Sequence, residues 1–149
     1  MIMKQFQGRI VTPGTAKAKA VVTHEGFNTL ASLQKALQFG DKTASCNDQN
    51  NQELYGKPTA GYALCLPQTI GSTTGGLVLY CACAMHRQSA CMLFSNHIDS
   101  LAAAGAILAD VWLDDISMPV VDCLGDEFLD YVRDDMMITI DENGLVTVE

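Results

Sequence analysis

The sequence has few basic residues and no long apolar run, and these two absences argue against two kinds of partner. It contains 9 Lys and Arg against 17 Asp and Glu, which gives a formal net charge of −8. Nucleic acids and anionic membrane surfaces attract basic proteins, so we expect neither as a partner. No run approaches the ~20 apolar residues of a membrane-spanning helix. The N-terminal MIMKQFQGRI lacks the apolar segment of a secretory signal, so we expect a cytoplasmic protein.

The six cysteines do not form a recognisable metal-binding motif. Cys81 and Cys83 are close in sequence, but no second pair lies at the spacing of a zinc site. Most of the cysteines lie in apolar runs such as YCACAM and ACMLF, where reduced cysteine behaves as a small hydrophobic residue. We therefore expect reduced, largely buried thiols and no metal bound by this chain. The six are Cys46, Cys65, Cys81, Cys83, Cys91 and Cys123.

Hydrophobic periodicity and turn residues predict strands at both ends of the chain and alternating helices and strands between them. Two hairpins are predicted: residues 4–11 with 18–23 through Pro13-Gly14, and residues 136–149 through Asn143-Gly144. Helices are predicted at residues 28–37, 76–87, 97–105 and 126–132. Short apolar strands are predicted at residues 60–67, 90–94, 106–110 and 119–122. The polar residues 41–57 form a long excursion, either a surface loop or an interface loop.

These elements predict the fold class. The chain has 149 residues, of which 48% are apolar and 17% charged, so one domain spanning residues 1–149 is expected. Wholly apolar strands that alternate with helices are typical of a parallel sheet covered on both faces. The hairpins require antiparallel pairing as well. We therefore expect an α/β fold with mixed sheets, in which two sheets share one layer of helices.

The stretch IGSTTGG, residues 70–76, is the candidate functional site. If a helix begins near Thr74, residues 71–75 form a strand-to-helix turn whose backbone N–H groups lack intrahelical partners and attract anions. Ser72 could then bind a carboxylate or a phosphate, or act as a base with a stabilised alkoxide. The alternative is a helix start that the Ser and Thr hydroxyls merely cap. The stretch matches neither the P-loop nor the nucleophile elbow.

The same stretch resembles the Gly-Ser-Ser-Thr-Gly-Ser turn in the small, swivelling domain of the aconitase X family. Other segments resemble that family in the same order. VTPGTAKAKAVV is similar to its opening Pro-Gly-x-Ala hairpin, and ELYGKPTAGYALCLP to its Pro-Leu-x-Gly segment. LAAAGAILAD, MPVVDC and DENGLVTV are similar to its Ala-Leu-Gly-Ala-Ile-Val-Ala segment, its Pro-Val-Val segment and its closing hairpin. The ordered set covers nearly the whole chain.

The resemblance implies a swivelling β/β/α fold akin to the mobile domain of aconitase, and a role as the small subunit of a hydro-lyase. It also implies a larger aconitase-like subunit that holds an iron or iron–sulfur cluster, and a small carboxylate substrate. Carried over by position, Ser72 is the catalytic serine, which would take the acidic proton alpha to the carboxylate. Gly71, Thr73, Thr74 and Gly75 are the expected substrate-binding residues.

The resemblance gives two substrate classes, cis-3-hydroxy-L-proline in bacteria and mevalonate 5-phosphate in archaea. The family often has Arg before the first glycine, where this chain has Ile70, and two family serines become Thr73 and Gly76. Loss of the Arg removes a bidentate phosphate donor. We therefore expect a cis-3-hydroxy-L-proline dehydratase, with phosphomevalonate dehydratase as the alternative.

Two other functions remain open on the sequence alone. One is a non-catalytic anion-binding or regulatory module of the same fold. The other is a phosphoryl carrier through His97, which lies at the start of a predicted helix. Asp99 and Asp110 are expected to be helix-end charges, and Trp112 a core or interface residue.

Overall fold

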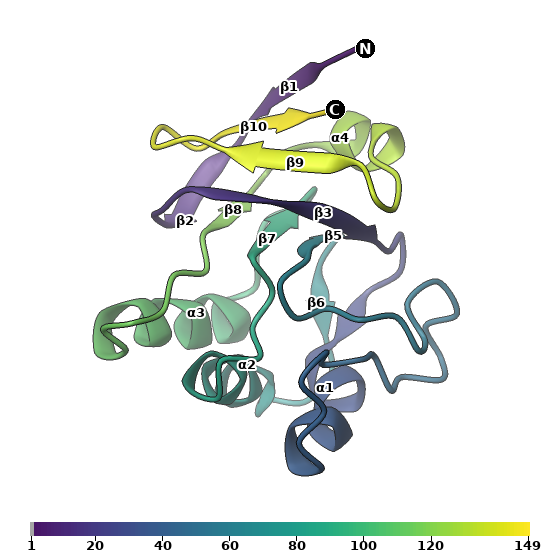
Figure 1. The fold of residues 1–149 in the computed structure, drawn as a ribbon, viewed down its shortest axis with the longest axis vertical. Coiled ribbons are helices and arrows are strands. Elements are labelled where there is room, and N and C mark those ends of the chain that lie inside the picture. Colours follow the sequence, from purple (N-terminus) through teal and green to yellow (C-terminus); the bar gives the residue numbers. More distant parts are fainter. Residues whose placement is uncertain (1) are drawn as a thin grey trace.

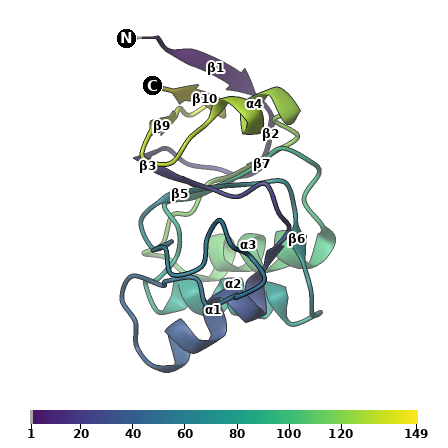
Figure 2. The ribbon, with the colours of Figure 1, turned by 90° about the vertical axis from the view of Figure 1, so that its right-hand side faces the viewer.

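The computed structural model describes residues 2–149, which form three layers (Figures 1 and 2). An antiparallel sheet packs on a mixed sheet, and three helices cover the other face of the mixed sheet. The helices are α1 (Thr29–Gln38), α2 (Gly75–Ala84), α3 (Ser100–Trp112) and α4 (Asp126–Tyr131). The strands are β1 (Lys4–Gln7), β2 (Arg9–Thr12), β3 (Ala16–Val22), β4 (Phe27–Asn28), β5 (Ala63–Leu66), β6 (Thr69–Ile70), β7 (Cys91–Phe94), β8 (Val120–Asp122), β9 (Met137–Ile140) and β10 (Leu145–Val148). Within residues 2–149, no helix is long and apolar enough to cross a membrane.

Two parts of the chain take part in both sheets. Across the two sheets together, the strands follow the order β1-β10-β9-β3-β5-β7-β8-β2. The first half of β3 pairs antiparallel with β9, and its second half pairs parallel with β5. Gly8 separates β1, which pairs with β10, from β2, which pairs with β8. A Cβ on Gly8 would lie 2.4 Å from the backbone oxygen of Asp122, so only glycine fits where the chain crosses between the sheets.

The middle strands are apolar throughout because each of their faces packs into a different core. Leu64 and Met92 belong to the core beneath helices α1, α2 and α3. Their neighbours Cys65 and Leu93 belong to the core between the two sheets. The prediction that the parallel strands are covered on both faces is therefore confirmed. Helices cover one face, and the antiparallel sheet covers the other. This is the mixed β/β/α architecture expected from the sequence.

The predicted N-terminal hairpin is wrong. Strand β2 pairs with β8, and β3 pairs with β9 and β5, so the two strands that flank Pro13-Gly14 are not neighbours in the sheet. The physical reason is that the two strands join different sheets: β2 pairs with β8 in the mixed sheet, and the half of β3 next to Pro13-Gly14 pairs with β9 in the antiparallel sheet. The second predicted hairpin, β9 with β10, is confirmed.

The predicted strand at residues 106–110 is also wrong, because α3 continues through it to Trp112. Gly105 was expected to end the helix. Instead it lies where α3 crosses α2, and its Cβ would be 2.1 Å from the backbone oxygen of Gly76. Ala102, Ala106 and Ala109 lie at helical spacing and are buried, which favours a helix that packs closely on α2.

The other predicted elements are found, with shifted ends. Helix α1 is capped by Asn28, whose side chain accepts a hydrogen bond from Ala31 N at 3.1 Å. The helix predicted at residues 76–87 is α2, which ends at Ala84. The predicted strands at residues 60–67, 90–94 and 119–122 are β5, β7 and β8, and the helix at residues 126–132 is α4.

Residues 41–57 pack against the end of β3. Leu54 and Cys46 are buried there, and Asn51 Nδ2 donates a hydrogen bond to Thr23 Oγ1 at 3.1 Å. The carboxylate of Glu53 accepts a hydrogen bond from the backbone N–H of His24 at 2.6 Å and lies 2.8 Å from His24 Nδ1. That pairing holds the pKa of His24 above its ordinary value. The segment is therefore attached to the domain by apolar packing and by a polar network that is buried at Asn51 and Thr23 and exposed at Glu53 and His24.

Replacing Arg9 with leucine should make the protein more sensitive to acid. Asp122 is fully buried and accepts hydrogen bonds from Arg9 Nε at 2.9 Å and Arg9 Nη2 at 2.6 Å, and from Ile98 N at 2.8 Å. Burial alone would raise the pKa of Asp122, but these donors outweigh it and hold the pKa below its ordinary value.

A carboxylate with a depressed pKa stabilises the fold at neutral pH, and this stabilisation is lost as the pH falls through the folded-state pKa. Without Arg9 that pKa rises, so unfolding should begin at a higher pH. Circular dichroism between pH 7 and pH 2 measures the shift, with Lys17→Leu, at an exposed position on β3, as the control. Equal acid midpoints for Arg9→Leu and the control would contradict this role of the pair.

Candidate functional site

The stretch at residues 70–76 forms the predicted strand-to-helix turn. Strand β6 ends at Ile70, and α2 begins at Gly75, whose N–H donates to the backbone oxygen of Ser72 at 3.0 Å. Gly71 has a φ of +102°, a conformation that residues with side chains rarely adopt. A Cβ there would also lie 2.7 Å from the Asn28 side chain, so the turn requires glycine at this position.

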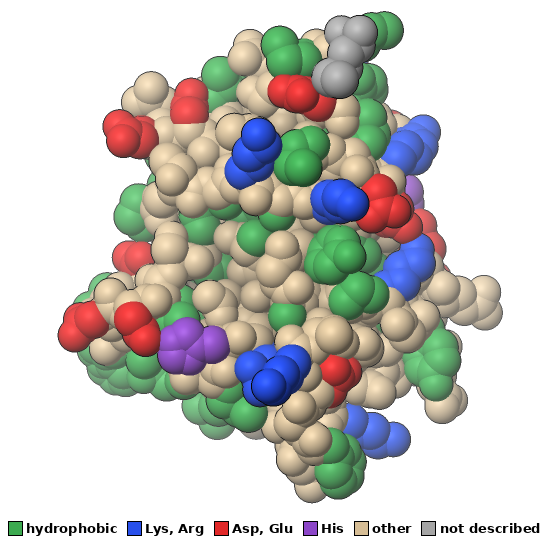
Figure 3. All heavy atoms as spheres, viewed as in Figure 1, with side chains coloured by type: hydrophobic (Ala, Val, Ile, Leu, Met, Phe, Trp, Pro, Cys, Tyr) green, Lys and Arg blue, Asp and Glu red, His purple; other side chains and the backbone are tan. Residues whose placement is uncertain are grey.

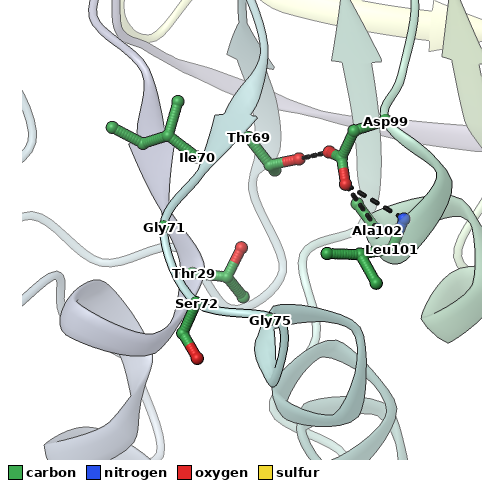
Figure 4. A pocket seen from close by; sticks show the side chains of 9 residues that line it. All are labelled: Thr29, Thr69, Ile70, Gly71, Ser72, Gly75, Asp99, Leu101 and Ala102. Carbon is green, nitrogen blue, oxygen red and sulfur yellow. Dashed lines mark hydrogen bonds between the residues drawn. The ribbon is translucent and has the colours of Figure 1, made fainter.

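The N-termini of three helices meet beside this turn (Figure 4). Helix α1 begins at Thr29, α2 at Gly75, and α3 at Ser100 directly after its cap Asp99. Each helix follows a strand or extended segment that leads down from the sheets, which brings the three N-termini to the same side of the layer. They surround a pocket of about 220 Å³, lined by Thr29, Thr69, Ile70, Gly71, Ser72, Gly75, Asp99, Leu101 and Ala102.

Asp99 supplies the one charged side chain in the pocket lining. Its Oδ2 accepts hydrogen bonds from Leu101 N at 3.1 Å and Ala102 N at 3.0 Å, so the predicted helix-end role is confirmed. Its Oδ1 accepts a hydrogen bond from the Thr69 hydroxyl (Figure 4). The lining contains no Lys, Arg or His, so the only full charge that this chain brings to the pocket is negative.

Ser72 is exposed at the edge of the pocket. Its hydroxyl lies 2.9 Å from the Thr74 hydroxyl and accepts a hydrogen bond from Thr74 N at 3.2 Å. In Figure 4 it points away from the pair formed by Thr69 and Asp99. Within residues 2–149, the N–H groups of Gly76 and Leu77 at the start of α2 have no hydrogen-bond acceptor. Of the N–H groups expected to attract anions at this turn, one therefore donates directly to the Ser72 hydroxyl, and those of Gly76 and Leu77 form the open, positive end of α2.

Four of the five predicted site residues line two separate surfaces. Gly71, Ser72 and Gly75 line the pocket. Thr73 is exposed and does not line it, and Thr74 lines a separate apolar groove between α1 and α2. The structure thus brings three of the five to one cavity, and their catalytic and binding roles remain predictions.

Two of the three glycines of this stretch are required for reasons other than the close approach of a ligand. Gly71 is required by its backbone conformation, and Gly76 by the helix crossing, where a Cβ would lie 2.2 Å from the backbone oxygen of Leu101. Gly75 differs, because a Cβ there would have no neighbour closer than 3.7 Å. Of the three, only Gly75 is not required by the internal packing of the described residues.

Residues 2–149 do not fit an iron or iron–sulfur centre of their own. No group of three or more His, Cys, Asp or Glu side chains in residues 2–149 is placed to hold a metal ion. All six cysteines are free thiols, and Cys46, Cys65, Cys83 and Cys91 are buried in the cores. Burial raises the pKa of the Cys83 thiol to about 11 and that of Cys91 to about 12, which disfavours the thiolate form that binds metals.

His97 lies outside the pocket lining. It precedes Ser100, the first residue of α3, and its Nδ1 lies 2.9 Å from the backbone oxygen of Ile98. Its Nδ1 is also 4.0 Å from the buried carboxylate of Asp122. His97 therefore contributes nothing to the pocket lining, and no observation on the described residues favours a carrier role.

Sequence reasoning missed Thr29, Thr69 and Leu101 as pocket residues. The signal that would have found Thr29 is its place at the start of the helix predicted at residues 28–37. Helices that follow neighbouring strands begin at the same edge of the fold, so residues at their caps are candidates for a shared site. Thr69 and Leu101 are brought in by tertiary packing alone.

Comparisons with known proteins agree on one family. The sequence model of the Aconitase X swivel domain matches residues 5–148. The phosphomevalonate dehydratase small subunit of Aeropyrum pernix is 30% identical over 93 residues, 62% of this chain and 64% of that protein, so the match spans less than two thirds of that relative. The corresponding subunit of Archaeoglobus fulgidus is 25% identical over 147 residues, 97% of this chain and 99% of that protein. The structure of Thermococcus kodakaraensis aconitase X in its holo form has a TM-score of 0.79 at 22% identity and covers 98% of both chains, which shows the same fold.

Proposed function

Since the chain belongs to the Aconitase X swivel domain family, we propose that it is the small subunit of an aconitase X-type hydro-lyase. The family resemblance seen in the sequence is thereby confirmed. The observation that carries the proposal is the position of Ser72, which lines a pocket where three helix N-termini meet. Two relatives are named small subunits, so the chain would act with a larger subunit. We propose the cytoplasm as the location of this pair.

In this proposal Ser72 removes a proton from the carbon alpha to the substrate carboxylate. The C–H electron pair becomes the new C=C bond, the neighbouring C–O bond breaks, and hydroxide leaves. Ser72 must be an alkoxide to accept the proton, and two features favour the anion: the hydrogen bond from Thr74 N and the positive end of α2. Gly71, Thr73, Thr74 and Gly75 would bind or position the substrate around this turn.

We place the iron or iron–sulfur cluster of the enzyme on the larger subunit. This chain offers no ligand set for it among residues 2–149, so its residues are assigned only the proton transfer and part of the substrate pocket. The pocket is open at its edge, where Ser72 is exposed, and the larger subunit would complete it there.

We propose cis-3-hydroxy-L-proline as the first candidate substrate. Ile70 stands where a phosphate-binding Arg is often found in the family, and it lines a pocket that has no cation of its own. The carboxylate of Asp99 would repel a phosphate group but would attract the ring ammonium of a hydroxyproline. Both observations favour a substrate without phosphate.

Mevalonate 5-phosphate is the second candidate, favoured by the names of the two archaeal relatives. For this substrate the larger subunit would have to supply the phosphate-binding cations. The two candidates therefore differ in which subunit recognises the charged end of the substrate.

The test is to co-express the chain with the aconitase X large subunit of the same genome, purify the complex anaerobically and assay both substrates. We expect dehydration of cis-3-hydroxy-L-proline by the complex and no activity of the small chain alone. Turnover of mevalonate 5-phosphate only would move the assignment to the second candidate. A complex with no dehydratase activity would favour a non-catalytic anion-binding module and contradict the proposal.

A further inference from the structure

Helices α2 and α3 lack the charged surface of ordinary solvent-facing helices. Asp110 is the only charged residue in the two helices together, although the chain has a net charge of −8. A helix at the surface of a monomeric protein usually carries charged and polar residues on its outer side. The outer side of these two helices is therefore not built for contact with water.

Seven large apolar residues occupy that outer side, which we call the apolar helix face. Leu77 is 63% exposed, and Val111 and Trp112 are each 64% exposed. Figure 3 shows apolar side chains along the lower left edge of the molecule, over α3 and α2. The seven residues of the apolar helix face are Leu77, Met85, Leu101, Ile107, Leu108, Val111 and Trp112.

The exposed residues of α3 follow the helical repeat. Leu101, Leu108 and Val111 lie on one side of the helix, and the buried Ala102, Ala106 and Ala109 lie on the other. The Trp112 ring meets the Tyr80 ring of α2 edge-on, with the ring centroids 6.1 Å apart. The outer sides of the two helices therefore form one continuous surface.

This surface begins at the candidate site. Leu101 belongs both to the apolar helix face and to the pocket lining, and Leu77 is two residues after the pocket residue Gly75. Beyond Leu77, a groove of about 540 Å³ between α1 and α2 is lined mainly by apolar side chains, including Val78, Cys81 and Met85. A protein that closes the pocket from its open edge would also cover these residues.

We infer that the apolar helix face is the docking surface for the larger subunit. This inference rests on the proposed function, since it takes the larger subunit as the occupant. Two relatives are named small subunits, and a surface depleted of charge and containing an exposed Trp is typical of the core of an interface. An uncharged face also fits a partner that must approach a chain of net charge −8 without repulsion.

The test measures the affinity between the purified small chain and the aconitase X large subunit of the same genome, using Leu108→Lys and Val111→Lys. Lysine is a good helix former and is favourable near a helix C-terminus, so α3 should remain folded, as thermal unfolding will check. Each substitution should raise Kd by about 30-fold or more, because it places a charge inside an apolar contact. Met3→Lys, a change at an exposed apolar residue directly before β1 in the antiparallel sheet, is the matched control and should leave Kd unchanged.

Turnover separates docking from chemistry. At saturating large subunit, Val111→Lys should regain the kcat of the unsubstituted chain, because Val111 does not line the pocket. Unchanged Kd values for both Lys variants would overturn the inference while leaving the proposed function in place. The chain alone could form dimers that the Lys variants abolish without changing Kd for the large subunit. That result would instead assign the apolar helix face to a second copy of this chain. If the unsubstituted chain does not bind the large subunit, the occupant is wrong and the inference fails.

Discussion

Replacing Ser72 with alanine should lower the turnover of the assembled enzyme by about 100-fold to 10,000-fold, the usual contribution of a general acid or base. Ser72 lines the pocket, and its hydroxyl accepts a hydrogen bond from the backbone N–H of Thr74, directly before α2. Loss of that hydroxyl removes the proton acceptor but no buried contact, because Ser72 is exposed. The kcat of the reconstituted complex, at saturating large subunit, is the quantity to measure.

The two threonines of the turn are the controls for Ser72. Thr73→Val and Thr74→Val should reduce turnover less, since the two threonine hydroxyls would position or bind the substrate and would not transfer its proton. Loss of the Thr74 hydroxyl removes a partner at 2.9 Å from Ser72, so this variant should also shift the pH profile of kcat. Near-normal turnover of Ser72→Ala, with an inactive threonine variant, would mean that the proton-transfer role belongs to another residue.

Replacing Gly105 with alanine should cause the largest loss of stability of any single methyl addition considered for this protein. The new Cβ would lie 2.1 Å from the backbone oxygen of Gly76 and 2.7 Å from its carbonyl carbon. Overpacking a core costs about 1–3 kcal/mol when side chains can adjust. Here the obstructing atoms are backbone, so α2 and α3 must move apart. We expect a loss of about 3 kcal/mol or more from a total stability on the order of 5–15 kcal/mol.

Gly75→Ala is the matched control for Gly105→Ala. Its Cβ would have no neighbour closer than 3.7 Å, and alanine is a better helix former than glycine. The free energy of unfolding should stay the same or rise by up to about 1 kcal/mol. Urea unfolding of both variants measures the difference. Equal stability of Gly105→Ala and Gly75→Ala would contradict the close crossing of the two helices.

Several local features were predictable from the sequence because the atoms that cause them are neighbours along the chain. Asn28 and Asp99 cap the helices that follow them. Asn143-Gly144 closes the hairpin of β9 and β10, and the glycine has the positive φ that such a turn requires. The strand-to-helix turn around Ser72 follows from the same kind of local signal. The ordered family segments extended these local predictions to the overall fold.

Features that depend on distant partners could not be predicted in this way. The pairing of β2 with β8 and of β3 with β9 depends on which strand edges are already occupied. A local turn signal at Pro13-Gly14 carries no information about those edges. The length of α3 likewise depends on its contact with α2, where Gly105 packs against Gly76 instead of ending the helix.

The sequence by itself determined the helix caps, the closing hairpin, the family and the position of Ser72 at a turn before α2, because each depends on neighbouring residues or on the order of segments. Only the tertiary structure decided that Thr29, Thr69 and Asp99 share a pocket with Ser72. It also decided that α2 and α3 turn an apolar side outward. The physical reason is that a helix has two sides, and its sequence shows how apolar each side is but not which side the rest of the chain covers.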